Sequence, residues 1–379
     1  MKLALVLACA CVLLAGCGGS AIPAQRTGLQ RVLDSLVTGQ FRAAPGAAAY
    51  VSGPHGTWQG AAGFADVARR VPMTPDVRSR IGSVSKLWTA TVVVRLAQEG
   101  KLSLDDTVAK WLPGVFPYGN RITIRELLNH TSGMVDDNDI NARPAYWLGK
   151  IHNATLRREF LAIARASAKH PAVTVSPGFE MQVAAALPLL FGPGTRYHYS
   201  NIGYKTAAAI AEKASHASLA DLYRRFIIDP LRLTSAGYDP TAAIAGAHAL
   251  GYVVESGGKA QPNAGAGEGD LAASGGVTVS APDEARFLVA LVQGRIVSKP
   301  YLRQIEQPTL QSYGLGTGVG TICGMRVFTH GGATTSYMAE VAVNGDGTRV
   351  AVLLANGRTY NSWADYLPVQ ALNDLFCAA

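Results

Sequence analysis

The chain has few cysteines, little charge and no repeated segment, and each shortage excludes a class of protein. Of its five cysteines, only Cys323 and Cys377 lie beyond residue 17. No cysteine–histidine spacing is typical of a metal site, so we expect neither a metal nor another cofactor. The absence of heptads, internal repeats and low-complexity tracts excludes coiled coils and solenoids. A length of 379 residues, with 48% hydrophobic, therefore predicts one large globular domain, or two lobes that share a core.

The positive charge lacks the clustering that nucleic-acid binding requires. The net charge is +8, but the basic residues stand singly or in pairs such as Arg69-Arg70 and Arg157-Arg158. Because no basic helix or basic–aromatic stripe is present, we expect no nucleic-acid partner. No obligate protein partner is evident either.

The N-terminus is typical of an export signal. Lys2 precedes an apolar run over residues 3–14, which is too short to span a membrane comfortably. Leu14-Ala15-Gly16-Cys17 resembles a bacterial lipobox, with an ordinary signal peptide as the alternative. We expect residues 1–16 to be the signal peptide, 17–25 a tether and 26–379 the folded domain. Lipidation of Cys17 would anchor that domain to the cell membrane or envelope, outside the cytoplasm. In an exported chain Cys323 and Cys377 can form a disulfide, and two buried thiols are an equal alternative.

Patterns typical of strands lie near both ends of the chain, with helical patterns between them. We expect strands at 47–52, 57–63, 325–330, 337–344 and 349–355, and terminal helices at 23–41 and 363–376. This order predicts an α+β fold in which both termini build one antiparallel sheet, flanked by the terminal helices, with a mainly helical lobe inserted. Residues 240–275 look like loops. Residues 135–190 are mixed, with helices expected near 155–167 and 180–190, and this region is a candidate wall of the site.

Ser83 and Lys86 stand three residues apart at the start of a helical pattern that runs to about Gln98. Residues at this spacing share one face of a helix. A serine needs an adjacent base, and burial or a helix N-terminus can lower the pKa of a lysine enough to provide one. The same motif at Ser256 and Lys259 lies in a glycine-rich stretch without a helix behind it. The motif alone is therefore compatible with chance, and other residues must decide.

Tyr199 and Asn201 follow a turn-rich loop and can point the same way from an extended or turn backbone. A phenol near a lysine can share its proton, and an amide can orient the lysine and hold a substrate carbonyl. Tyr118-Gly119-Asn120 matches the same pattern, and we assign it no role.

His330-Gly331-Gly332-Ala333 ends a predicted strand. Glycines there let a substrate backbone lie close to the strand edge. A backbone N–H on that edge, together with the N–H of Ser83, would form an oxyanion hole. His330 could bind substrate or assist proton movement, and the alternative is a histidine that merely precedes a turn.

These three motifs, in this order, resemble the serine β-lactamase and penicillin-binding superfamily. The closest branch holds the class C β-lactamases, D,D-carboxypeptidases and related esterases. Residues 123–134 also resemble that branch, with His130 expected to be structural, as do Pro193-Gly194-Thr195 and Ala273-Ser274-Gly275-Gly276. The resemblance covers roughly residues 30–375 and implies the β-lactamase-like fold.

The third motif departs from the family pattern. In penicillin-recognising members, hydroxyls on this strand help to bind the substrate carboxylate, but Gly331 and Ala333 carry none. Thr334, Thr335 or Arg358 could substitute. Without them, a neutral ester or amide is the better expectation.

The resemblance implies a serine hydrolase that works through an acyl-enzyme on a small ester, amide or peptidoglycan-derived substrate. Ser83 is the expected nucleophile, Lys86 the base and Tyr199 the proton donor to the leaving group. Asn201 would orient Lys86 and the substrate, and the N–H groups of Ser83 and Ala333 would bind the oxyanion. The alternatives are a cell-wall D,D-carboxypeptidase or β-lactamase, and a non-catalytic penicillin- or peptidoglycan-binding domain.

Overall fold

The computed structural model describes residues 23–38, 42–169, 173, 175–255, 258–263, 265, 267–269, 271–359 and 366–379. The expected signal peptide, the lipidation site Cys17 and the competing Ser256 lie outside the described residues. Helix α1 (Pro23–Val37) begins inside the last part of the expected tether. Among the described residues, no helix combines the length and the apolar character that a membrane crossing requires.

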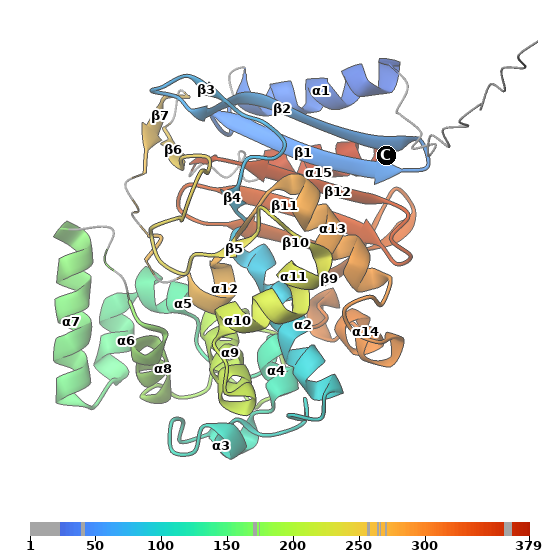
Figure 1. The fold of residues 1–379 in the computed structure, drawn as a ribbon. Coiled ribbons are helices and arrows are strands. Elements are labelled where there is room, and N and C mark those ends of the chain that lie inside the picture. The colour runs from blue at the N-terminus through green and yellow to red at the C-terminus, as the bar shows by residue number, and fades with distance from the viewer. Residues whose placement is uncertain are drawn as a thin grey trace, which may run out of the picture.

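A seven-stranded antiparallel sheet built from both ends of the chain forms the centre of the molecule (Figure 1). Its order is β3-β2-β1-β12-β11-β10-β9. The strands are β1 (Gly46–Gly53), β2 (Gly56–Asp66), β3 (Val71–Pro72), β9 (Gly318–Ile322), β10 (Met325–Ala333), β11 (Met338–Asn344) and β12 (Val350–Ala355). The predicted α+β fold, with an antiparallel sheet from both termini, is confirmed.

Alternation along β12 explains why helices cover both faces of the sheet. Ala351, Leu353 and Ala355 belong to the core formed with α1 and α15 (Tyr366–Ala378). Val350, Val352 and Leu354 point the other way, into the core shared with α2 (Ser85–Gln98) and α13 (Ala281–Val292). Successive side chains of a strand face opposite sides, so a strand that is apolar throughout needs a layer on each side.

The inserted lobe is mainly helical, as expected. Its helices are α3 (Val108–Trp111), α4 (Ile124–Leu128), α5 (Asp137–Ala142), α6 (Pro144–Lys150), α7 (Ala154–Lys169), α8 (Pro177–Ala185), α9 (Asn201–Ser215), α10 (Leu219–Tyr223), α11 (Asp229–Leu231) and α12 (Ala272–Gly275), and α14 (Lys299–Glu306) follows α13. Short 3₁₀ turns span Gly82–Val84, Gly119–Arg121 and Leu310–Ser312, and a π-helical turn spans Arg224–Ile228. The helix expected near 180–190 begins earlier and ends at Ala185, because Leu187 is followed by Pro188.

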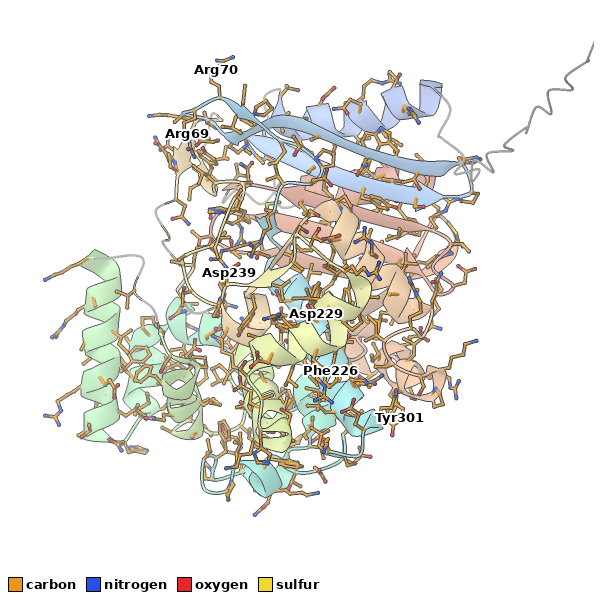
Figure 2. The ribbon with its side chains drawn as sticks, in the orientation of Figure 1. Arg69, Arg70, Phe226, Asp229, Asp239 and Tyr301 are labelled. Atoms are coloured by element: carbon orange, nitrogen blue, oxygen red, sulfur yellow. A yellow bond between two sulfur atoms is a disulfide. The ribbon has the colours of Figure 1, made fainter. Side chains whose placement is uncertain are left out.

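Residues 240–275, expected to be loops, contribute two short strands to one of two small sheets, and the other small sheet uses strands on either side of this range. One has the order β13-β6-β7, from Gly357–Thr359, Tyr252–Val254 and Ala260–Pro262. The other has the order β4-β8-β5, from Ser79–Arg80, Val277–Val279 and Gly237–Tyr238. Such two- and three-residue strands are too short to produce a periodic pattern. Asp239, labelled in Figure 2, pairs with Arg78 at 2.6 Å and ties the second sheet to the loop that follows.

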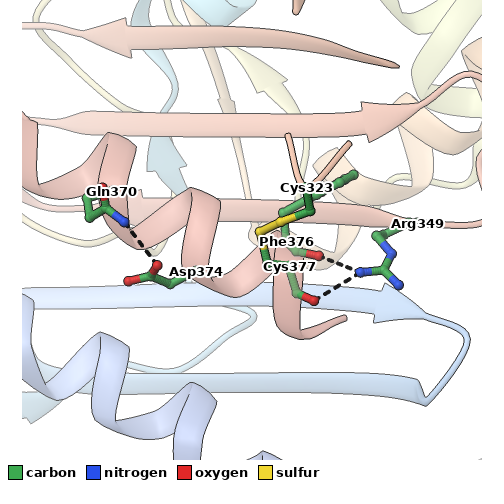
Figure 3. Close-up of a disulfide and its surroundings, with 6 residues drawn as sticks. All are labelled: Cys323, Arg349, Gln370, Asp374, Phe376 and Cys377. Atoms are coloured by element: carbon green, nitrogen blue, oxygen red, sulfur yellow. Dashed lines mark hydrogen bonds between the residues drawn. A yellow bond between two sulfur atoms is a disulfide. The ribbon is translucent and has the colours of Figure 1, made fainter. Parts of the chain in front are cut away.

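Cys323 and Cys377 form a disulfide, which decides between the two alternatives left open by the sequence (Figure 3). It joins the turn between β9 and β10 to the end of α15. Arg349 reinforces this attachment, since its Nη1 donates to the carbonyls of Phe376 and Cys377 at 3.0 and 3.1 Å. The C-terminal helix is thereby fixed to the sheet.

Candidate active site

Ser83 and Lys86 lie one turn apart at the N-terminus of α2, at the bottom of a cleft. Ser83 belongs to the 3₁₀ turn that leads into the helix, and Lys86 is its second residue. Lys86 Nζ lies 3.1 Å from Ser83 Oγ. The structure therefore brings the expected nucleophile and base into hydrogen-bond contact.

Two more acceptors fix the Lys86 ammonium. Its Nζ donates to Asn201 Oδ1 at 2.7 Å and to the carbonyl of Ser274 at 2.9 Å. Asn201 thus has the orienting contact expected of it. The contact with Ser274 was not predicted, although residues 273–276 resemble the family pattern. Every residue type has a backbone carbonyl, so the sequence does not show which carbonyl accepts this hydrogen bond.

The pKa of Lys86 is lowered to about 7, chiefly by burial, with a smaller contribution from the charge of Lys205. The carboxyls of Asp136 and Asp137 oppose this effect. At neutral pH a large share of Lys86 is therefore the free amine, the form that can accept a proton.

Tyr199 approaches Ser83 from the other side. Its hydroxyl donates to Ser83 Oγ at 2.8 Å, and its ring centroid lies 4.7 Å from Lys86 Nζ. Burial raises the pKa of the Tyr199 phenol, so it stays protonated near neutral pH. The phenol is therefore suited to donate a proton, and Lys86 to accept one.

A buried acidic pair that sequence reasoning missed supports Asn201. The Asn201 backbone N–H donates to Asp136 Oδ1 at 2.7 Å, and its Nδ2 donates to Asp137 Oδ1 at 2.8 Å. Because Nδ2 is held by a carboxylate, the amide oxygen is turned toward Lys86. Lys205 Nζ donates in turn to Asp137 Oδ2 at 3.2 Å. The run Asp136-Asp137 was the available signal, but an acidic pair alone is more typical of a solvated turn.

The two acidic side chains differ in charge state. Burial, then the neighbouring charge of Asp137, raises the pKa of Asp136 to about 8. Burial also raises the pKa of Asp137, but the Lys205 charge and hydrogen bonds outweigh it and bring the pKa to about 2. Asp137 is therefore the ionised member at neutral pH.

The end of β10 lies against the 3₁₀ turn that carries Ser83. A Cβ on Gly332 would lie 1.9 Å from the carbonyl oxygen of Ile81 and 3.1 Å from the Ser83 nitrogen, so only glycine fits. Thr334 N donates to Tyr337 O across the two strands. In an antiparallel pair, successive N–H groups point alternately toward the partner strand and away from it. The N–H of the preceding residue, Ala333, therefore points away from β11. Strand β9 pairs with β10 only as far as Thr329, which leaves that edge open. The Ala333 N–H therefore faces this open edge, beside the turn that carries Ser83, as the predicted pair of oxyanion donors would require.

His330 lies beneath the cleft and does not line it. Its Nδ1 donates to the carbonyl of Gly331 at 2.6 Å, and its Nε2 accepts from Tyr313 Oη at 2.9 Å. Burial and the charge of Lys86 lower the pKa of His330 to about 4, so the ring is neutral. Both ring nitrogens are engaged, and this arrangement leaves neither for the substrate contact that the sequence suggested. His130 packs against Tyr199 with ring centroids 4.2 Å apart, and its Nδ1 accepts from Ser200 N, in keeping with a structural role.

The cleft above Ser83 has a volume of about 700 Å³. Its lining includes the expected residues Ser83, Tyr199, Asn201, Gly331, Gly332 and Ala333, the candidate carboxylate ligands Thr334, Thr335 and Arg358, and the unanticipated Asp137, Asn141 and Glu340. Helix α5 thus forms one wall, as hypothesised for residues 135–190. A second cavity of about 440 Å³ adjoins it, sharing Asp137, Asn141 and Gly267 and lined by apolar side chains of α7 and α8.

This arrangement is equipped for acyl transfer. It combines a hydroxyl nucleophile, an amine with lowered pKa, a protonated phenol and two backbone donors around one cleft. The described residues contain no group of three or more His, Cys, Asp or Glu side chains placed to hold a metal ion.

Comparison with known proteins places the chain among relatives of related chemistry. Residues 33–373 match the family described as Beta-lactamase. The chain is similar to a D-aminopeptidase of Cereibacter sphaeroides, with 28% identity over 336 residues, which cover 82% of this chain and 56% of that protein. It is also similar to Penicillin-binding protein 4* of Bacillus subtilis, with 32% identity over 168 residues, which cover 44% of this chain and 32% of that protein.

Among solved structures, a D-stereospecific amidohydrolase from Streptomyces sp. superposes with a TM-score of 0.73 at 28% identity. That match covers 93% of this chain and 99% of the other. By contrast, the chain spans only 32% and 56% of the two curated relatives described above. The correspondence with them is therefore to a part of each.

Proposed function

This chain belongs to the beta-lactamase family, and from that premise we propose that it is a serine hydrolase that cleaves an amide or ester through an acyl-enzyme. The observation that carries the proposal is the position of Ser83 Oγ between an amine that can accept a proton and a phenol that can donate one. Lys86 Nζ lies 3.1 Å from it and Tyr199 Oη 2.8 Å from it. The names of the D-aminopeptidase and D-stereospecific amidohydrolase relatives favour a D-configured amide as the substrate.

In the acylation step Ser83 Oγ attacks the substrate carbonyl and its proton passes to the neutral amine of Lys86. The Ser83 and Ala333 N–H groups stabilise the oxyanion. As the tetrahedral intermediate collapses, Tyr199 gives its proton to the leaving group and recovers one from the Lys86 ammonium. Lys86, now neutral, then takes a proton from water, the resulting hydroxide attacks the acyl-enzyme, and the proton passes to Ser83 Oγ as the acid is released.

The direct test compares the wild-type protein with Ser83→Ala on a short-chain p-nitrophenyl ester and on D-alanine p-nitroanilide. We expect turnover by the wild type, loss of nearly all of it in the variant, and a mass increase at Ser83 when the acyl-enzyme is trapped. Substantial turnover by a clean Ser83→Ala preparation would show that the nucleophile is a different residue.

A cell-wall D,D-carboxypeptidase or β-lactamase is the second candidate, favoured by the similarity to Penicillin-binding protein 4*. Gly331 and Ala333 still lack the hydroxyls that a substrate carboxylate would need, and the Thr334 hydroxyl donates instead to Glu268 at 2.6 Å. A chromogenic cephalosporin separates the two candidates. Its hydrolysis would favour the second candidate, whereas a stable Ser83 adduct without turnover would indicate a binding domain.

We also propose that the domain acts outside the cytoplasm, held by a lipid on Cys17. The leader sequence supports this localisation, and so does the disulfide between Cys323 and Cys377, because disulfides persist mainly in oxidising compartments.

A further inference from the structure

A carboxyl group occupies the space that Gly331 leaves empty at the edge of the cleft. Glu340 on β11 lies directly opposite Gly331 on β10. This position alternates with the hydrogen-bonded pair of Gly332 and Ala339, so the two strands and their side chains approach closely here. A Cβ on Gly331 would lie 2.9 Å from Glu340 Oε1 and 3.0 Å from Oε2. Any other residue at position 331 would therefore push this carboxyl aside.

Glu340 faces the same cleft as the nucleophile. Both Ser83 and Glu340 line the 700 Å³ cavity, and Gly331 is two residues from the oxyanion donor Ala333. At about 3.3 Å per strand residue, that separation corresponds to roughly 7 Å along β10. A group bound at Glu340 would thus lie only a few bonds from the scissile carbonyl.

The Glu340 carboxyl has no hydrogen bond or ion pair with any other residue in the described part of the chain. The other ionisable groups of the cleft are engaged elsewhere. Asp137 is held by Asn201 and Lys205, and Arg358 Nη1 donates to the carbonyl of Thr334 at 3.0 Å. Burial alone raises the pKa of Glu340 to about 8. A largely buried carboxyl without a counter-charge is costly unless a ligand supplies the partner.

We propose that Glu340 is a specificity residue that binds an ammonium group of the substrate, close to the bond that Ser83 attacks. An ammonium would give the buried carboxylate a charge-assisted hydrogen bond and hold it in the ionised form. A substrate carboxylate placed there would be repelled, or would require Glu340 to take up a proton. This inference rests on the proposed acyl-transfer function and adds the charge of the substrate to it.

The test uses the full-length protein and a matched pair of substrates, D-alanine p-nitroanilide and its N-acetyl derivative. The two differ in the ammonium, which acetylation removes. Within one variant, the ratio of their kcat/KM values cancels losses caused by poor folding. We expect the wild type to prefer the free amine, and Glu340→Gln to lower that ratio by about 10- to 100-fold, the effect of removing a charged hydrogen bond.

Glu159→Gln provides the control, because Glu159 is an exposed residue of α7 outside the cleft. It should leave the ratio at the wild-type value. Labelling of Glu340→Gln at Ser83 by a neutral fluorophosphonate shows that the variant retains its nucleophile.

The outcomes separate the two proposals. If Glu340→Gln keeps the wild-type ratio of kcat/KM values while Ser83-dependent hydrolysis continues, Glu340 does not bind the substrate ammonium, and the proposed function stands. If the wild type prefers the acetylated substrate, the charge assignment is overturned. If the wild type hydrolyses neither anilide nor a p-nitrophenyl ester, the proposed function fails and this inference fails with it.

Discussion

Burial of a single lysine sets the conditions under which the site can react. Lys86 has three acceptors within 3.1 Å, which suit an ammonium, yet burial brings its pKa to about 7. The residue therefore changes charge close to neutral pH. A protonated Lys86 cannot accept the Ser83 proton, whereas a neutral one can.

The pH dependence of acylation follows from this assignment. Because the neutral amine is the active form, kcat/KM for a p-nitrophenyl ester should rise about tenfold per pH unit below 7 and level off above about pH 8. Tyr199 does not add a falling limb in this range, because burial raises the pKa of its phenol. Initial rates between pH 5.5 and 8.5, corrected with Ser83→Ala, provide the measurement. A profile that is flat across this range would show that Lys86 is not the base.

At the level of residues, the sequence predicted those candidate site groups that belong to short motifs. Ser83, Lys86, Tyr199 and Asn201 were predicted from several motifs in a fixed order, and the structure joins them by hydrogen bonds. Glu340 was not predicted, since its importance depends on strand register and on the empty space above Gly331. Register and burial are properties of the folded chain, and a lone glutamate in an apolar strand pattern does not reveal them.

Close contact between two elements, β10 and the 3₁₀ turn before α2, underlies the predicted oxyanion site. Gly332 permits this contact, because a Cβ there would overlap the Ile81 carbonyl oxygen at 1.9 Å. The turn itself uses Gly82, whose φ is 50° and whose Cβ position lies 2.8 Å from the Ala333 nitrogen. Neither element can move away without separating the Ser83 and Ala333 amides.

Gly332→Ala should therefore impair catalysis more than stability. The added methyl must push β10 away from Ile81, which displaces the Ala333 donor, and loss of one oxyanion donor typically costs about 10²- to 10³-fold in kcat. Gly320→Ala on the neighbouring strand β9 is the matched control, since nothing lies within 4 Å of its Cβ position. Steady-state kinetics and thermal unfolding of both variants separate the two effects. A Gly332→Ala enzyme with kcat within about threefold of wild type would contradict this oxyanion geometry.

Among the elements, long periodic segments were predicted well and short ones poorly. Strand β12 and helix α7 were anticipated because their patterns extend over several residues. The small sheets around β6 and β8 were missed, because their strands have only two or three residues each. Tertiary contacts stabilise such short strands, for example the ion pair between Arg78 and Asp239. These contacts join residues far apart in the sequence, so no local pattern predicts them.

For the molecule as a whole, the central sheet separates the predicted anchor from the catalytic cleft. Helix α1 packs with α15 on one face of the sheet, and α2, which carries the nucleophile, lies on the other (Figure 1). A tether that enters at Pro23 therefore reaches the domain on the face opposite Ser83. Pro23 lies six residues after Cys17, a span of at most about 22 Å when the chain is fully extended. The lipid would thus hold the α1 face toward the membrane and leave the cleft open to substrates on the far side.

Cys17→Ala in the full-length protein tests this arrangement. In a bacterial host, the wild type should partition into the membrane fraction and require detergent for release, because the acyl chains of a lipidated cysteine bind bilayers stably. The variant should lose this partitioning and lipid labelling yet keep the Ser83-dependent esterase activity, since residue 17 lies before the helix on the opposite face. Cys11→Ala, within the same leader, should remain in the membrane. If Cys17→Ala fractionates as the wild type does, the anchor is not a lipid on Cys17, and the ordinary signal peptide becomes the better description of residues 1–16.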